Sequence, residues 1–386
     1  MYYKSLQILR GWAALTVVLY HLGFYANALG GQPNSFYRHF DEHYSQGAWF
    51  FFGLSGFLMA YLVDTGYRRF LLRRLLRIYP TFFVAAIGVT IAKGLVFHTW
   101  IFNISICKAL LLLPFGTTPT YPLGVEWTLV YEVFFYLVCS IFANDLLRRA
   151  FPYFLLGWFI WLVTAFTELN ADIWFSPARG ASIFLPTAVN IPSSFMNALF
   201  IGGGLIYYIF KRLPPLGGKA VSLLVALASL VYISGDPYLS RHLLRANPQY
   251  IWWIRQTALR ISLLSISFGF IVVAACSYER IINSRGRSGM AWRFLERFGD
   301  CSYALYLIHV PIITVLIVLA RSRWNGAPIG NGICTLALAA ALVVGWQFGK
   351  FDVWMHNTFK KRFFISTPKP DLRGDTISPA PIAPRP

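Results

Sequence analysis

Apolar runs of membrane-crossing length recur along most of this chain and limit what it can fold into. About 20 apolar residues form a helix that crosses the hydrocarbon core of a bilayer, and glycines, prolines and charge clusters separate ten such runs here. Of the 386 residues, 57% are hydrophobic and only 13% are charged, far fewer charges than a soluble domain carries. The sequence therefore predicts an all-α polytopic membrane protein. Its predicted helices lie near Ser5 to Tyr25, Gly47 to Gly66, Tyr79 to His98, Gly124 to Asn144, Phe151 to Thr167, Ser193 to Phe210, Gly217 to Ile233, Gln256 to Ser277, Asp300 to Ala320 and Gly330 to Val353.

The basic residues set the expected orientation of these helices. The chain has 34 Lys and Arg against 15 Asp and Glu, a formal net charge of +19. In a soluble protein this excess would suggest a nucleic-acid partner. With the N-terminus inside, however, most of these residues fall in cytoplasmic loops, as the positive-inside rule requires. The sequence therefore predicts cytoplasmic N- and C-termini and contact with anionic membrane lipids, and no nucleic-acid partner.

The expected organisation is one membrane domain, residues 1–355, followed by a tail. The tail, residues 356–386, is basic and Pro-rich, so it is expected to be cytoplasmic and disordered. A cleavable signal peptide ending near Ala28 is an alternative for the start, but Arg10 and His21 would then be discarded with it. The five cysteines show neither C-x-x-C nor paired spacing, so neither a disulfide framework nor a zinc site is predicted.

Two ionisable residues lie within the first predicted helix. Arg10 and His21 are 11 residues apart, which places both side chains on one helix face, about 16 Å apart along the axis. Ionisable groups at mid-membrane are costly and are functional candidates by default. A fixed cation near the cytoplasmic edge and a titratable imidazole deeper in the membrane suit an anionic substrate that reacts at its far end, with His21 as general base. The alternative is that Arg10 snorkels to the interface and His21 hydrogen-bonds to a neighbouring helix.

A cluster of arginines precedes the third predicted helix. If this stretch is helical, Arg69, Arg73 and Arg77 recur every four residues, and Arg74 and Arg77 form an i, i+3 pair. Guanidinium groups match phosphate oxygens bidentately, so such a face can hold the phosphates of a nucleotide-containing cofactor. The alternative is a basic loop that only sets the membrane topology.

Polar residues also occur inside the fourth and ninth predicted helices. In the fourth, Glu132 and Tyr136 share a stripe, and a carboxylate there either pairs with a buried cation or stays protonated. Glu126, nearer the outer surface, can hydrogen-bond a sugar or simply begin the helix. In the ninth, Tyr306 and His309 share a face, although packing around Pro311 is an alternative to a chemical role.

Taken together, these stretches resemble the integral-membrane acyltransferase family 3, whose bacterial members O-acylate surface and exported glycans. Five pieces match in family order: R-x10-H from Arg10 to His21, Phe51 to Phe57 with Gly53 and Gly56, R-x-x-R at Arg74 and Arg77 followed by Ile78-Tyr79-Pro80, Trp127 to Tyr136, and Ser302 to Pro311. The small residues Gly53 and Gly56 also permit close approach of a helix or a substrate.

The resemblance implies an O-acyltransferase in the bacterial inner membrane. The expected donor is acyl-CoA, with acetyl as the expected acyl group, and the expected acceptor is a sugar or polysaccharide. No metal is expected. Some family members carry a fused extracytoplasmic hydrolase-like domain, and none is seen here, so either this protein modifies the acceptor directly or a separate partner, such as a polysaccharide-assembly protein, completes the transfer. The expected catalytic residues are His21, Arg10 and Glu132, the cofactor-binding residues Arg73, Arg74 and Arg77, and the substrate-binding residues Glu126, Trp127, Tyr136, Tyr306 and His309.

A transporter that moves a glycan or lipid-linked sugar without modifying it is the alternative function. Such proteins often contain paired, interrupted helices in two related halves, and no such pairing is evident in this sequence. Direct transfer and transfer through an acyl-enzyme intermediate both remain compatible with the residues.

Overall fold

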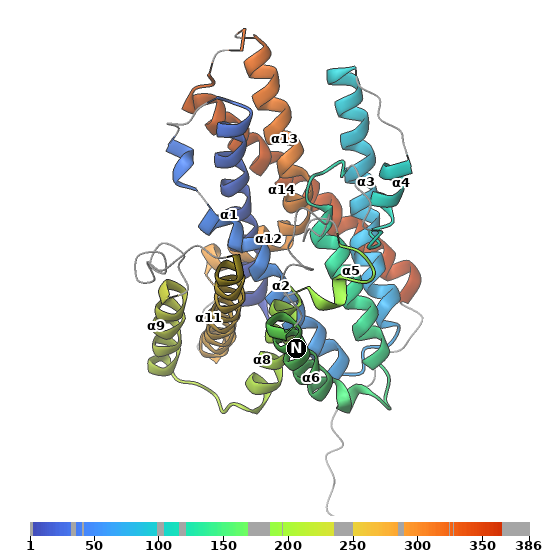
Figure 1. Cartoon of the computed structure of the whole chain (residues 1–386), viewed down its shortest axis with the longest axis vertical. Coiled ribbons are helices and arrows are strands. Elements are labelled where there is room, and N and C mark those ends of the chain that lie inside the picture. Colours follow the sequence, from blue (N-terminus) through green and yellow to red (C-terminus); the bar gives the residue numbers. More distant parts are fainter. Residues whose placement is uncertain are drawn as a thin grey trace, which may run out of the picture.

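The computed structural model describes residues 3–31, 36–40, 42–98, 104–115, 121–168, 186–194, 196–234, 250–284, 289–323, 325–326 and 328–364. In this part of the chain all regular structure is helical apart from one isolated bridge between Phe115 and Thr187. The all-α prediction is therefore confirmed for the described residues (Figure 1). Most of the expected tail, from residue 365 onward, lies outside them.

Each of the ten predicted helices falls on a helix of the structure. Six helices are long and apolar enough to cross a membrane among the described residues, namely α1, α2, α3, α11, α13 and α14. The structure thus supports a membrane protein, while the count of ten crossings and the orientation stay predictions. The helices are α1 (Lys4–Ala28), α2 (Glu42–Asp64), α3 (Phe70–Phe97), α4 (Ile104–Leu110), α5 (Glu126–Phe142), α6 (Phe151–Glu168), α8 (Asn197–Arg212), α9 (Gly218–Ser234), α11 (Tyr250–Ser284), α12 (Met290–Asp300), α13 (Ser302–Arg323) and α14 (Asn331–Phe364).

Two helix boundaries differ from the prediction in ways that affect the site. Helix α3 begins at Phe70 rather than near Tyr79, because the stretch before Pro80 is rich in Leu and Arg, which favour helix, and has no glycine. Helix α14 does not end at residue 355 but continues to Phe364, because no proline or glycine interrupts the chain there. The proposed boundary between membrane domain and tail therefore falls inside a helix.

One helix begins earlier than predicted and another was not anticipated. Helix α11 begins at Tyr250, six residues before the predicted start near Gln256. Residues 290–300 form α12, an amphipathic helix too polar to be recognised from apolar runs. It packs against α1, which carries Arg10 and His21.

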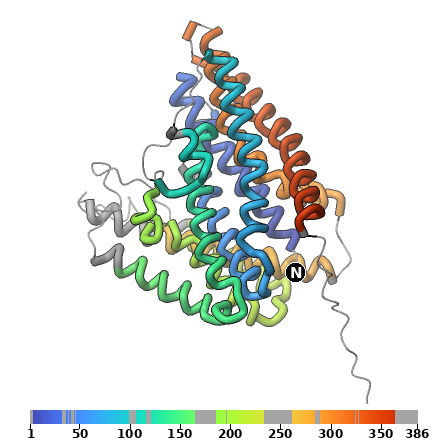
Figure 2. Tube along the Cα trace, turned by 90° about the vertical axis from the view of Figure 1, so that its right-hand side faces the viewer, coloured from blue at the N-terminus to red at the C-terminus, as the bar shows by residue number. Residues whose placement is uncertain are grey.

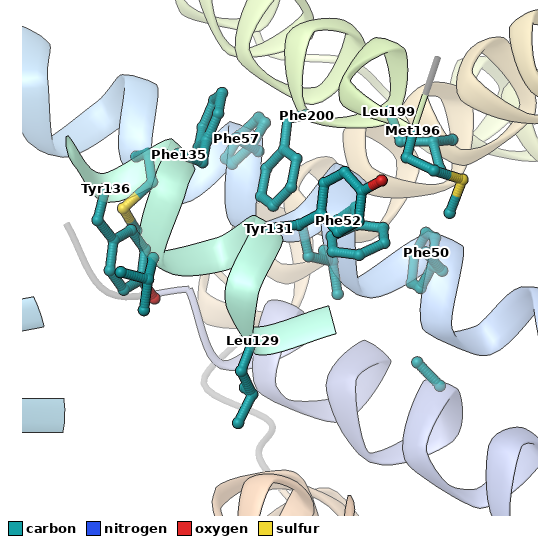
Figure 3. Packing of buried hydrophobic residues seen from close by; sticks show 14 of the residues in the cluster. Phe50, Phe52, Phe57, Leu129, Tyr131, Phe135, Tyr136, Met196, Leu199 and Phe200 are labelled. Atoms are coloured by element: carbon teal, nitrogen blue, oxygen red, sulfur yellow. The ribbon is translucent and has the colours of Figure 1, made fainter. Parts of the chain in front are cut away.

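Aromatic rings fill the centre of the bundle between α2, α5 and α8. Figure 3 shows Phe52, Phe135 and Phe200 converging from these three helices. The Phe135 and Phe200 rings stack with centroids 4.1 Å apart, and the Phe52 ring lies 4.8 Å from that of Phe200. Such contacts fix the relative positions of the helices because aromatic pairs combine large buried area with preferred geometry.

Helices α2 and α8 cross with their backbones in contact. A Cβ atom on Gly203 would lie 1.9 Å from the carbonyl oxygen of Gly53, and one on Gly56 would lie 2.0 Å from that of Phe200. The close helix approach expected at Gly53 and Gly56 is therefore confirmed, and it brings the aromatic centre together.

A buried carboxylate holds the start of α1 against α11. Glu279, which is only 3% exposed, accepts hydrogen bonds from the backbone N–H groups of Lys4 and Ser5 at 3.0 and 2.9 Å and from the Ser5 hydroxyl at 2.6 Å. These bonds satisfy donors that a helix N-terminus leaves free. They therefore fix the N-terminal end of α1, the part of the helix that carries Arg10.

Candidate functional site

Two adjoining cavities occupy the region between α1, α2, α3 and α5. They share the lining residues Arg10, Leu58, Arg74 and Arg77, so the three arginines lie at the boundary between them, here called the passage. The first, here called the inner cavity, is lined by aliphatic, aromatic and hydroxyl side chains together with Glu132 and these arginines. The second, here called the basic vestibule, has a volume of about 430 Å³. The polar residues of the inner cavity are Arg10, Ser55, Arg74, Arg77, Thr128, Glu132, Tyr136, Tyr303 and Tyr306.

The basic vestibule carries a strong excess of positive charge. Seven cationic side chains line it, and no Asp or Glu of the described residues does so. A cavity with one sign of charge and low-dielectric walls concentrates ligands of the opposite sign. The vestibule therefore suits a polyanion such as a phosphorylated nucleotide. Its cations are Arg10, Arg73, Arg74, Arg77, Lys211, Arg280 and Lys360.

Arg77 is already neutralised within the protein. Its Nη1 atom donates to the two carboxylate oxygens of Asp352 on α14, at 2.7 and 2.9 Å. Asp352 is fully buried and also accepts a 2.5 Å hydrogen bond from the Thr81 hydroxyl. This pair joins α3 to α14, which run side by side in Figure 2. Arg77 can line a phosphate site, but most of its charge is balanced before any ligand enters.

Arg10 and Arg74 are differently placed. Neither forms an ion pair with a described residue; Arg10 donates to the Gln7 amide oxygen at 3.3 Å, and the Arg74 guanidinium lies 5.9 Å from the centroid of the Tyr136 ring. Both side chains are partly buried, and a partly buried guanidinium that no carboxylate contacts directly gains from an anionic ligand. These two guanidinium groups are therefore the strongest candidates for binding phosphate at the passage.

Glu132 lies in the inner cavity, as its place among the motif residues suggested. Its Oε1 atom accepts a hydrogen bond from the Tyr136 hydroxyl at 2.5 Å and lies 3.5 Å from the Ser55 hydroxyl. The Thr128 and Tyr306 hydroxyls are 2.9 Å apart on the same wall. This gives the apolar cavity a short row of groups able to orient a polar substrate.

His21 on α1 and His309 on α13 form a hydrogen-bonded pair. The Nδ1 atom of His21 lies 3.0 Å from Nε2 of His309 and 3.0 Å from the carbonyl oxygen of Val17. Nδ1 of the fully buried His309 lies 2.7 Å from the carbonyl oxygen of Tyr306. His21 therefore does bond to a neighbouring helix, the alternative that its spacing had left open.

These contacts assign the protons of both rings. A carbonyl oxygen only accepts, so Nδ1 of His309 carries hydrogen, and in the neutral ring its Nε2 is then an acceptor. Nδ1 of His21 faces both this acceptor and the Val17 carbonyl, so it also carries hydrogen. The free lone pair of His21 is therefore on Nε2, to which no described residue bonds. Nε2 is the atom from which His21 can act as a base.

Neither histidine lines either cavity. Tyr306 connects them to the inner cavity, since its ring lies 5.7 Å from that of His309 and 5.7 Å from that of Phe51, another lining residue. The structure thus gathers the arginines, Glu132, Tyr136 and Tyr306 around one space. It places His309 next to Tyr306 of that space, and His21 next to His309.

Besides His309, two more of the expected substrate-binding residues lie outside both cavities. Glu126 is fully buried, and its two oxygens accept the backbone N–H groups of Leu123 and Val125 at 2.6 and 3.0 Å. It therefore fixes the turn before α5 instead of facing a cavity. Trp127 packs near Phe52 and Tyr131 and lines neither cavity. We do not carry these two residues into the proposed site.

Sequence reasoning missed the partners that complete the site. Asp352 had a recognisable signal, since a lone acid near the end of a long apolar segment is costly unless it is paired. Tyr303 and Ser55 carried only the weak signal of a hydroxyl within a motif. Lys360 was assigned to the tail.

A comparison with protein-family models decides the class. The model described as an acyltransferase domain matches residues 3–346, which is most of the chain. The chain belongs to the integral-membrane acyltransferase family 3. This acyltransferase has no significant match among curated proteins or among solved structures. The family match favours group transfer over unmodified transport and covers the R-x10-H histidine, the R-x-x-R arginines and Glu132. It ends within α14, before Asp352.

Proposed function

We propose that this acyltransferase moves an acyl group, expected to be acetyl, from cytoplasmic acyl-CoA to a hydroxyl of an exported or cell-surface polysaccharide. The observation that supports this most is that the two cavities adjoin and share Arg10, Arg74 and Arg77. A cationic vestibule next to a cavity of mixed apolar and hydroxyl-bearing side chains matches a donor with a phosphorylated nucleotide at one end and a pantetheine thioester at the other. The proposal places the enzyme in the bacterial inner membrane with ten crossings and both termini in the cytoplasm.

In this proposal the nucleotide phosphates of acyl-CoA lie in the basic vestibule. Arg74 and Arg10 bind them with charge-assisted hydrogen bonds, Arg73 assists from the rim, and Arg77 lines the passage. The pantetheine arm then extends past the arginines into the inner cavity, where Glu132, Tyr136 and Tyr306 offer polar contacts. The acyl group passes Tyr306 to reach the histidine pair, because Tyr306 lines the inner cavity and lies next to His309.

The transfer step uses the free lone pair of His21. Nε2 takes the proton of a sugar hydroxyl, and the oxygen attacks the thioester carbonyl to form the ester bond. The carbon–sulfur bond breaks, and the proton held by His21 passes to the departing CoA sulfur. When His21 is protonated, Nδ1–H donates to the neutral His309 and to the Val17 carbonyl, so both acceptors stabilise the imidazolium. Transfer through an acyl-histidine intermediate would use the same nitrogen as nucleophile.

Mass spectrometry of the surface polysaccharide tests the proposed function. A strain in which this gene is deleted should lose the acyl mass from the polysaccharide while polymer length and export are unchanged. Complementation with the wild-type gene should restore that mass. If deletion blocks export but leaves the chemistry of the remaining glycan intact, the protein transports the glycan and the proposal is wrong.

Replacement of His309 by Leu should lower kcat about tenfold and leave the KM for acyl-CoA nearly unchanged. Leu removes one of the two acceptors of the His21 Nδ1–H bond, but the Val17 carbonyl still holds the productive tautomer, so the loss is smaller than for His21 itself. His309→Gln, whose amide oxygen can accept the same bond, should recover part of the rate. Steady-state kinetics with acetyl-CoA and purified acceptor glycan measure both constants. A rise in KM with unchanged kcat, or no recovery by Gln, would contradict this positioning role.

A further inference from the structure

The C-terminal end of α14 forms one wall of the basic vestibule. His356, Phe359 and Lys360 line it together with residues of α1, α2, α3, α8 and α11. In Figure 2 the C-terminal end of α14, drawn in red, descends along the bundle toward the end at which the N-terminus lies. This part of the helix lies beyond residue 346, where the family match ends, so the family model does not account for it.

The spacing of these residues shows that the wall is one helix face. Asp352, His356, Phe359 and Lys360 stand at positions i, i+4, i+7 and i+8, which coincide on one side of an α-helix. Asp352 anchors this face through Arg77 and Thr81, so the wall is tied to α3 at its inner end. From there to Lys360 the helix extends about 12 Å along its axis. Trp354 points away and is 62% exposed.

The chemistry of this face fits the nucleotide end of a donor. Lys360 adds a cation to a vestibule that no described carboxylate lines, and its flexible stem can follow a phosphate group. Phe359, beside it, offers an aromatic face of the kind on which nucleobases stack. By contrast, Lys361 and Phe363 lie on the same helix but do not line the vestibule.

We propose that the end of α14, through Lys360 and Phe359, binds the phosphates and the base of the nucleotide part of acyl-CoA. This inference rests on the proposed donor and adds to it a binding element outside the family match. It gives the last helix of the chain a part in donor recognition rather than in membrane anchorage alone.

The matched pair Lys360→Glu and Lys361→Glu tests the proposal. Both variants change the net charge equally and sit at adjacent positions, so bulk attraction of an anion falls equally in both. Acetyl-CoA affinity is measured by titration calorimetry in nanodiscs of neutral phosphatidylcholine, so that anionic headgroups do not compete. Lys360→Glu should weaken binding about tenfold and Lys361→Glu less than about twofold. Phe359→Leu should likewise weaken binding.

A second acyl donor shows which part of acyl-CoA Lys360 recognises. Acetyl-pantetheine carries the same thioester without the nucleotide, so Lys360→Glu should slow transfer from acetyl-CoA but not from acetyl-pantetheine. Equal effects of the two Lys variants on acetyl-CoA binding, or equal loss with both donors, would overturn the role of α14. Absence of acetyl-CoA binding by the wild-type protein would remove the proposed donor, and the inference with it. If instead the wild-type protein binds acetyl-CoA and Lys360→Glu binds it equally well, only the role of α14 is wrong and the proposed donor stands.

Discussion

Replacement of His21 by Ala is expected to reduce acyl transfer about 100- to 10,000-fold, the range over which a general base usually contributes. The hydrogen-bond pattern gives the reason, because Nδ1 of His21 is committed to Val17 and His309 and leaves Nε2 as the free base. Alanine removes that nitrogen without touching the vestibule. Acetyl-CoA affinity should therefore be unchanged. The measurement is acyl content of the surface polysaccharide by mass spectrometry, together with calorimetric binding of acetyl-CoA to the purified variant.

The control for this variant is His98→Ala. His98 follows α3 at its C-terminus and is exposed, so its loss should change neither transfer nor binding. A well-expressed His21→Ala protein that acylates the glycan normally would refute His21 as the base. Loss of donor binding in the same variant would instead show that His21 holds the donor and that the catalytic base lies elsewhere.

The sequence predicted which residues share a helix face far better than which helices meet. Arg74 and Arg77 lie on α3 and line the cavities, and Glu132 and Tyr136 on α5 line the inner one, as their spacing suggested. The pairs Arg10–His21 and Tyr306–His309 are divided, because Arg10 and Tyr306 line the inner cavity and neither histidine does. Helical periodicity is a local property, so spacing is sufficient for that step. It does not identify the helix opposite, and the contacts of His21 with His309 and of Arg77 with Asp352 were therefore not foreseen. Both join residues more than 270 positions apart.

The sequence did not predict helices, or parts of helices, that are not apolar. Helix α12 is amphipathic, and the end of α14 is basic, so neither resembles a membrane span in composition. Helices continue past the membrane when no proline or glycine ends them. The misplaced boundary mattered, because it assigned to a disordered tail the residues that form a wall of the vestibule. Glu126 shows the converse case: its motif position suggested a substrate contact, and in the structure its carboxylate accepts hydrogen bonds from backbone N–H groups.

The two arginines of the R-x-x-R motif should behave differently when each is replaced by Gln. Arg74 has no carboxylate partner among the described residues, so its guanidinium is available to a phosphate, and Arg74→Gln should weaken acetyl-CoA binding about 10- to 100-fold. Arg77 is paired with the buried Asp352. Arg77→Gln leaves that carboxylate buried without its cationic partner, so the variant should chiefly lower the free energy of unfolding, by about 3 to 5 kcal/mol. Donor affinity of the folded Arg77→Gln protein should fall much less than that of Arg74→Gln.

The double variant Arg77→Gln with Asp352→Asn separates charge balance from ligand binding. It removes both members of the pair, so no buried charge is left alone, and thermal unfolding in detergent should recover most of the stability that Arg77→Gln loses. Acetyl-CoA affinity, measured by the same titration for all three proteins, should stay close to that of the wild type. If the double variant binds the donor as weakly as Arg74→Gln, then Arg77 contacts the phosphates directly. In that case the hydrogen bonds between Arg77 and Asp352 would break when the donor binds, and both arginines of the motif would bind its phosphates.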